Sequence, residues 1–324
     1  MRLSLLGLLL VACSSSSSGG SPDAAAPDDT GDAAAADVAQ SPTITTVFVI
    51  PLENKSSSQI YGDTTDAPYI NNTLLARGAH ATMFTDELPT LPSEPHYVWM
   101  EAGTNSFSDR TFTGDGDPSA ANSTASTDHL VTQLEAAGVP WMAYQEGITS
   151  GSCPIKTSGN YAAKHDPFVF FKDVVGSPPS ASAARCAAHH KSYADFPADL
   201  AAGLSGYVFI TPNLCHEMHG GFTCPSLFDT KANIKAGDDW LAAELPRLLD
   251  YTDAHSDALI LLVWDEGDTN NVMPFIALGG GARAGYTSSI AYTHGAFLAS
   301  LQHWFGVPRL TADAADPTLV DMFD

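Results

Sequence analysis

Runs of apolar residues alternate with segments of helical periodicity along most of the chain. The strand candidates are continuously apolar, as expected of strands buried on both faces, and they cover residues 43–50, 139–144, 207–211, 259–264 and 275–278. The helix candidates have apolar residues three or four positions apart, at residues 67–77, 127–137, 238–255 and 294–305. This alternation predicts an α/β fold with a mostly parallel central sheet and helices on both faces.

Polar clusters directly follow three of the predicted strands. Glu53 and Asn54 follow the first, residues 213–219 follow the strand at 207–211, and Asp265 and Glu266 follow the strand at 259–264. Ligands of such sheets bind beyond the carboxyl ends of the strands. Carboxylates at two strand ends favour a shared divalent cation, although Asp265 and Glu266 taken alone could be a solvated loop start with a helix-capping acid.

The first 42 residues are expected to lie outside the folded domain. Residues 1–12 have a signal-peptide pattern, with an apolar run too short to span a membrane, and they end in a lipobox-like sequence before Cys13. An ordinary signal peptide with a chance cysteine is the alternative. Residues 13–42 are rich in Ser, Ala, Asp, Pro and Gly, which predicts a disordered linker. We therefore expect an exported bacterial lipoprotein, anchored in the outer membrane or at the cell surface through Cys13, with its folded domain at residues 43–324.

The chain is strongly acidic, with a formal net charge of −23 at pH 7. Nucleic acid is therefore excluded as a partner, because phosphate backbones require clustered Lys and Arg. A phosphate-bearing substrate would need local positive charge, and a bound metal cation is an obvious source.

Four cysteines remain when Cys13 is set aside, namely Cys153, Cys186, Cys215 and Cys224. An exported protein meets an oxidising compartment, and four cysteines allow three disulfide pairings. The short interval between Cys215 and Cys224 favours pairing these two, which leaves Cys153 with Cys186, both in loop-like segments. A zinc cluster is the alternative, but the sequence contains no CxxC pair.

Six short blocks together carry a family resemblance. They are PLENKS (51–56), PSEPHY (92–97), KHDPF (164–168), PNLCHEMH (212–219), WDEG (264–267) and YTH (292–294). In this order they resemble the phosphoesterase family that contains bacterial phospholipases C and secreted acid phosphatases, which is related to alkaline phosphatase. The resemblance covers residues 45–308 and is closest to the short, phosphatase-like branch. It implies an alkaline phosphatase-like fold and hydrolysis of phosphoric esters.

The resemblance also implies roles for individual residues. The nucleophile would be Ser93, with Thr90 as the alternative, although a serine beside prolines is by itself more typical of a turn. One divalent metal ion would be held by the family's metal-binding positions, with Ca, Mg or Mn favoured by the oxygen ligands and Zn possible. These positions are Glu53, Asn54, Ser93, Asp265 and Glu266.

Three histidines occupy family positions, and we expect His165, His219 and His294 to bind phosphate oxygens or to protonate the leaving group. The remaining histidines without motif support are expected at the surface: His189, His190, His255 and His303. Two positions depart from the family pattern. His96 stands where Asn is common, and Gly220 replaces an Asp that could orient His219.

The expected function is metal-dependent hydrolysis of phosphoric monoesters, as in acid phosphatases, on a soluble or lipid-borne substrate. A phospholipase C-like phosphodiesterase is the alternative. A non-catalytic surface binding protein fits less well, because the proposed metal and nucleophile positions are intact. A sulfatase is disfavoured, since the sequence lacks the Cys/Ser-x-Pro-x-Arg block that makes formylglycine.

Overall fold

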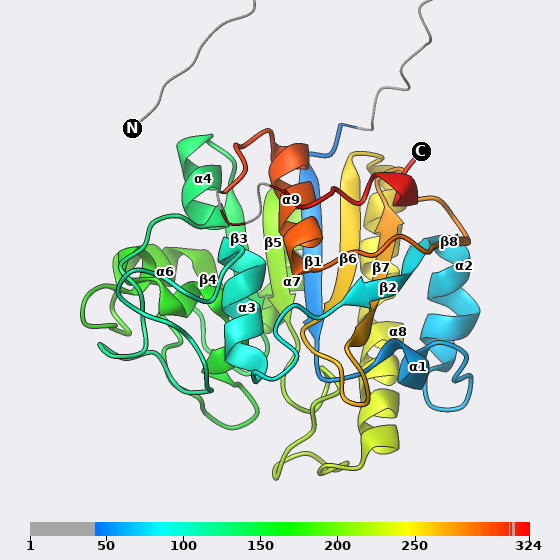
Figure 1. Ribbon diagram of the computed structural model, residues 1–324, viewed down its shortest axis with the longest axis horizontal. Helices are drawn as coiled ribbons and strands as arrows, with labels where there is room; N and C mark the ends of the chain where they lie inside the picture. The colour runs from blue at the N-terminus through cyan, green and yellow to red at the C-terminus, as the bar shows by residue number, and fades with distance from the viewer. Residues whose placement is uncertain (1–42, 311, 313–314) are drawn as a thin grey trace, which may run out of the picture. The chain divides into compact units, whose positions relative to one another are not determined.

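The computed structural model describes residues 43–310, 312 and 315–324 (Figure 1). The predicted signal peptide, Cys13 and the predicted linker lie outside these residues. No helix in the described part of the chain is long and apolar enough to cross a membrane.

The core of the domain is a mixed eight-stranded sheet with the order β4-β3-β5-β1-β6-β7-β2-β8. All pairs from β4 to β6 are parallel, and β7 runs antiparallel to both of its neighbours. The strands are β1 (Thr46–Leu52), β2 (Ala79–Thr85), β3 (Trp141–Gln145), β4 (His190–Ser192), β5 (Gly206–Thr211), β6 (Ala258–Trp264), β7 (Val272–Gly279) and β8 (Tyr286–Ser288). The predicted mostly parallel sheet is confirmed.

Helices cover both faces of this sheet. In Figure 1, α3 and α9 lie in front of it, and α7 and α8 lie behind it. The α-helices are α1 (Ser57–Ile60), α2 (Leu75–Arg77), α3 (Ser93–Ala102), α4 (Leu130–Ala136), α5 (Lys172–Val175), α6 (Ala184–His189), α7 (Phe196–Ala202), α8 (Thr230–Ala254) and α9 (His294–Phe305). The strands β1, β5 and β6 are buried along their whole length, which explains their continuously apolar sequences.

Several elements differ from their predicted bounds. The helix expected at residues 67–77 contains a π-helical turn, Ile70–Leu74, before α2. Helix α8 begins eight positions before its predicted start at 238, because Asp229 caps it by accepting a hydrogen bond from the amide of Ala232. Few apolar residues occupy its first turns, so the hydrophobic periodicity does not reveal them.

The two predicted disulfides, Cys153–Cys186 and Cys215–Cys224, are both formed. Cys186 lies in α6 and not in a loop. The prediction that His190 lies at the surface is wrong: its side chain is fully buried, with Nε2 3.0 Å from the Asp166 carboxylate. This pairing depends on tertiary packing between two distant segments, which no local pattern in the sequence signals.

A buried cluster of charged groups ties α3 to α4 and α5. His129 lies between two carboxylates, with Nδ1 3.0 Å from Glu101 and Nε2 3.1 Å from Asp173. Burial opposes protonation of His129, but its hydrogen bonds to Asp173 and Glu101 outweigh burial and raise its pKa. Glu101 is fully buried in α3, so the cluster fixes the helix that begins at Ser93.

We predict that His129→Ala lowers the free energy of unfolding by about 3–5 kcal/mol, because it leaves the buried carboxylate of Glu101 without its charged partner. Since the folded pKa of His129 is raised, its contribution is fully present below the unfolded pKa of about 6.5 and is lost as pH rises through the folded value. Urea unfolding at several pH values measures this. The exposed His255→Ala serves as control, and equal stability of the two variants would contradict the assignment.

Candidate active site

The site forms where β1 and β6 end side by side. Leu52 pairs with Trp264 in parallel register, so the residues that follow, Glu53 and Asp265, leave the sheet at the same edge. The amide of Asn54 donates to Oδ1 of Asp265 at 3.0 Å. Asn54 has a positive φ of 46°, a conformation that Asn tolerates better than most residues, and it turns the chain out of the sheet here.

Ser93 joins the two strand ends. It is the first residue of α3, and its hydroxyl lies 3.0 Å from Oε2 of Glu53 and 3.2 Å from Oε1 of Glu266. The side chain is almost fully buried, whereas Thr90 is exposed. The structure therefore brings Ser93, and not Thr90, into contact with the predicted metal-binding carboxylates.

The carboxylates crowd one another in a buried place. Burial, followed by the charges of Asp265 and Glu217, raises the pKa of Glu53 well above its ordinary value. Burial and Asp265 raise the pKa of Glu266 to about 8. Like-charged carboxylates with this donor geometry fit a divalent cation, which would relieve their repulsion.

A second group of side chains faces Glu53 from the other side. His165 places Nε2 3.4 Å from Oε2 of Glu53 and Nδ1 2.9 Å from Oε1 of Glu217, although the angles of these contacts do not make hydrogen bonds. Its ring stacks on Tyr97, whose hydroxyl donates to Oε1 of Glu53 at 2.5 Å. Burial, and then the charges of Lys164 and His219, lower the pKa of His165 well below its ordinary value.

His219 completes this group. One ligand atom each of Glu53, His165 and His219 lie within 4.8 Å of one another, so these three residues could hold a metal ion. Nδ1 of His219 donates to the Gly220 carbonyl oxygen at 2.7 Å, which leaves Nε2 as an acceptor or ligand atom in the neutral ring. The predicted oxygen-ligand set therefore has a neighbouring set of mixed nitrogen and oxygen donors.

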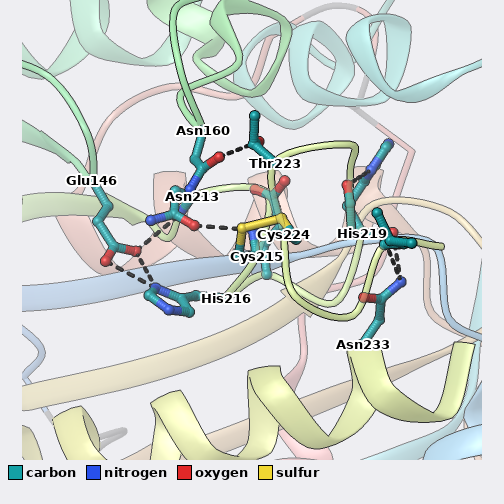
Figure 2. The surroundings of a disulfide bond; sticks show 12 residues. Glu146, Asn160, Asn213, Cys215, His216, His219, Thr223, Cys224 and Asn233 are labelled. Atoms are coloured by element: carbon teal, nitrogen blue, oxygen red, sulfur yellow. Dashed lines mark hydrogen bonds and ion pairs between the residues drawn. A yellow bond between two sulfur atoms is a disulfide. The ribbon is translucent and has the colours of Figure 1, made fainter. Parts of the chain in front are cut away.

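Figure 2 shows how the disulfide loop holds His219. The Cys215–Cys224 bond closes the loop. Asn233, which lies in α8, donates from Nδ2 to the His219 carbonyl oxygen at a distance of 3.1 Å. On the opposite side of the disulfide, His216 contacts Glu146 at 2.8 Å.

His294 lies on the other flank of the site, at the first position of α9. Its Nε2 donates to the carbonyl oxygen of Trp264 at 2.9 Å. Burial, and then the neighbouring charge of His96, lower the pKa of His294 to about 4. A neutral His294 is therefore suited to fixing the end of β6 rather than to donating a proton.

The contacts of His96 show what this residue does at a position where the family commonly has Asn. Its Nδ1 donates to the Pro92 carbonyl oxygen at 2.9 Å, and its Nε2 lies 2.9 Å from Asp86. Burial opposes protonation, but the hydrogen bond to Asp86 and the charge of Asp265 outweigh burial and raise the pKa of His96 to about 9. His96 thus adds a positive charge beside the carboxylates.

Sequence reasoning missed Glu217, Tyr97 and Lys164. All three stand inside blocks that carry the family resemblance, within a few positions of residues that were assigned. Lys164 is held by Asp115 at 2.7 Å, and its charge opposes the rise that burial causes in the pKa of Glu53 and of Glu217. It is therefore a protein cation at this edge of an otherwise acidic domain.

The fold is shared with several solved structures. It is similar to a phosphonate monoester hydrolase from Silicibacter pomeroyi, with a TM-score of 0.54 and 14% identity over 86% of this chain and 76% of that one. It is also similar to an alkaline phosphatase superfamily protein from Vibrio parahaemolyticus, with a TM-score of 0.53 and 12% identity over 86% and 72% of the two chains. The alkaline phosphatase-like fold predicted from the sequence is therefore confirmed.

The chain belongs to the Phosphoesterase family, whose model matches residues 79–308. It is 28% identical to the phosphatidylinositol-3-phosphatase of Mycobacterium tuberculosis over 87% of this chain and 84% of that protein. It is 29% identical to the phosphate-repressible acid phosphatase of Penicillium chrysogenum over 68% of this chain, but spans only 50% of that protein. The chain is a phosphoric ester hydrolase, and its substrates are phosphate esters.

Proposed function

We propose that the protein is a metal-dependent phosphomonoesterase with Ser93 as its nucleophile. The observation that carries this proposal is the position of the Ser93 hydroxyl, which lies within hydrogen-bond distance of both Glu53 and Glu266 at the carboxyl edge of the sheet. A serine hydroxyl is a weak nucleophile at neutral pH unless neighbouring groups activate it.

The residues present fit a divalent cation, because the carboxylates of Glu53 and Glu266 both lie within hydrogen-bond distance of the Ser93 hydroxyl. The charge of Asp265, whose Oδ1 accepts from the Asn54 amide, acts on both of these carboxylates. Glu53, Asn54, Ser93, Asp265 and Glu266 would hold the cation. When bound, such a cation lowers the pKa of a coordinated hydroxyl and offsets charge on the phosphoryl oxygens. Oxygen donors favour Ca, Mg or Mn, whereas the neighbouring His165 and His219 keep Zn possible.

The remaining steps of the reaction are carried out by side chains of the protein. Ser93 Oγ attacks the phosphorus, its proton passes to the carboxylate that accepts its hydrogen bond, and the ester oxygen leaves as an alcohol. His219 has a ring nitrogen within 4.8 Å of ligand atoms of Glu53 and His165, and its neutral ring, with Nε2 as acceptor, binds a protonated phosphoryl oxygen. The carboxylate passes the proton taken from Ser93 to the leaving oxygen. Lys164 and the protonated His96 attract the anionic substrate to this edge. Water then releases phosphate from Ser93.

A monoester substrate is favoured over a diester by the relatives that carry phosphatase names. The phospholipase C-like alternative rests on the sequence resemblance alone.

Ser93→Ala should lower kcat/KM for para-nitrophenyl phosphate by at least about 10³-fold, because removing one member of a catalytic unit removes most of its effect. Thr90→Ala is the matched control and should stay within about twofold of the wild type. The para-nitrophenyl diester of phosphorylcholine, measured in parallel, distinguishes a diesterase. Substantial activity in Ser93→Ala, or loss of activity in Thr90→Ala, would move the nucleophile away from Ser93.

The membrane anchor is a separate proposal that rests on the lipobox-like sequence before Cys13. An acylated Cys13 and a linker of residues 14–42 would keep the hydrolase at an outer-membrane or cell-surface location while leaving it free to reorient.

Cys13→Ser should therefore shift the protein from the membrane fraction to the soluble fraction while kcat/KM for a soluble phosphate monoester is unchanged. Fractionation of cells that produce either form, with intact-mass analysis of the mature protein, provides the measurement. Wild-type protein that is soluble and lacks acyl groups at Cys13 would refute the anchor.

A further inference from the structure

An exposed apolar surface lies beside the active site on the segment between β5 and α8. Its three members, Phe222, Leu227 and Phe228, are 89%, 53% and 54% exposed, and we call them the apolar tip. Among the described residues, the other exposed large hydrophobic side chains are Met83, Ile290 and Val320, which come from three different segments of the chain. Three in one short loop form a patch, and such patches commonly mark interaction surfaces.

The apolar tip lies at the same edge of the sheet as the catalytic groups. Its segment follows the carboxyl end of β5, which runs parallel to β1, and Phe222 is three positions after His219. In Figure 1 this segment extends beyond the carboxyl edge of the sheet, at the bottom of the view. A surface that meets the apolar tip would therefore also meet the side of the domain where the site opens.

The loop that carries the apolar tip is built to hold its shape. The Cys215–Cys224 disulfide closes its first half, and the amide of Gly221 donates to the Leu227 carbonyl oxygen at 2.8 Å. The rings of Phe222 and Phe228 meet edge to face, with centroids 5.0 Å apart. The loop therefore presents both rings to solvent in a fixed arrangement instead of folding them inward.

Leu227 adds a conformational cost to this exposure. Its φ of 50° lies in the left-handed region, which leucine rarely adopts. An exposed leucine held in such a conformation gains little burial in return, and strained positions of this kind concentrate at functional sites.

The charge of the loop differs from that of the rest of the chain. Residues 218–228 contain no Asp, Glu, Lys or Arg, although the chain has a net charge of −23. The first charged side chain on α8 is that of Lys231, which is 80% exposed and lies 3.9 Å from Asp66. The exposed acid Asp229 follows Phe228 directly, so the uncharged stretch ends there. The apolar tip itself carries no charge that a phosphate-bearing surface would repel.

We infer that the apolar tip inserts into the interface of a phospholipid bilayer and brings the site to lipid-borne phosphate monoesters. Aromatic and leucine side chains favour the boundary between headgroups and acyl chains, and Lys231 is placed to meet anionic headgroups. This inference rests on the proposed phosphomonoesterase function and names its substrate class. The predicted anchor at Cys13 would keep the domain near such a bilayer.

Flotation with vesicles tests this inference directly. The full chain carries Cys13→Ser in every arm, so that an acyl group cannot contribute to binding. Vesicles of phosphatidylcholine, alone or with about a tenth of phosphatidic acid, provide the bilayer. The test variant is Phe222→Ser with Phe228→Ser. The control is Val320→Ser, which removes an apolar side chain that is 62% exposed elsewhere in the domain.

The double variant should float at least about tenfold less than the parent, because two ring insertions are lost. Its kcat/KM for phosphatidic acid in vesicles should fall to a similar extent, while its kcat/KM for soluble para-nitrophenyl phosphate stays within about twofold. Val320→Ser should match the parent in all three measurements.

Three results would overturn the inference: a parent protein that does not float, a double variant that floats like the parent, or an equal loss of activity on soluble and lipid substrates. A parent that is a dimer and becomes a monomer in the double variant, without vesicle binding, would assign the apolar tip to a second copy of the chain. A parent that floats but hydrolyses neither ester would refute the proposed function and leave the bilayer contact standing.

Discussion

Mutual repulsion among buried carboxylates is the constraint on which the site depends. Glu53 and Asp265 are fully buried and follow adjacent strands, and Glu266 and Glu217 contribute further acidic groups to the same place. Removing such charges from water is costly unless opposite charge accompanies them. Burial and neighbouring acidic charges therefore raise the pKa of Glu53, of Glu217 and of Glu266. A cation at this position would turn an unfavourable cluster into a binding site.

The surrounding structure holds this cluster in place at several levels. The parallel register of β1 and β6 sets the positions of Glu53 and Asp265. Helix α3 places the Ser93 hydroxyl between Glu53 and Glu266, and the His129 cluster fixes the far end of that helix through Glu101. The disulfide loop holds His219 on the opposite side. The positive groups, Lys164 and His96, lie close enough to shift the pKa values of the acidic residues without entering their contacts.

Much of this arrangement could be predicted from the sequence, because continuously apolar strands and the polar residues that follow them are local patterns. The start of α3 could not, since Pro92 and Pro95 suggest a turn, although proline also fits the first turn of a helix. Glu217 stands between two histidines, and only the fold shows that it contacts His165. The burial of His190 and His129 likewise arises from partners distant in the sequence.

Metal-linked stability tests the central claim most directly. The thermal midpoint of chelator-treated protein is measured with added Ca, Mg, Mn or Zn, for the wild type, Asp265→Asn and the exposed control Asp253→Asn. When the free metal concentration is about 100 times the dissociation constant, metal binding raises the free energy of unfolding by about 2.7 kcal/mol. This increase raises the thermal midpoint by roughly 5–10 °C. We predict this rise in the wild type and in Asp253→Asn but not in Asp265→Asn. No rise with any of the four metals, or an equal rise in all three proteins, would contradict the account.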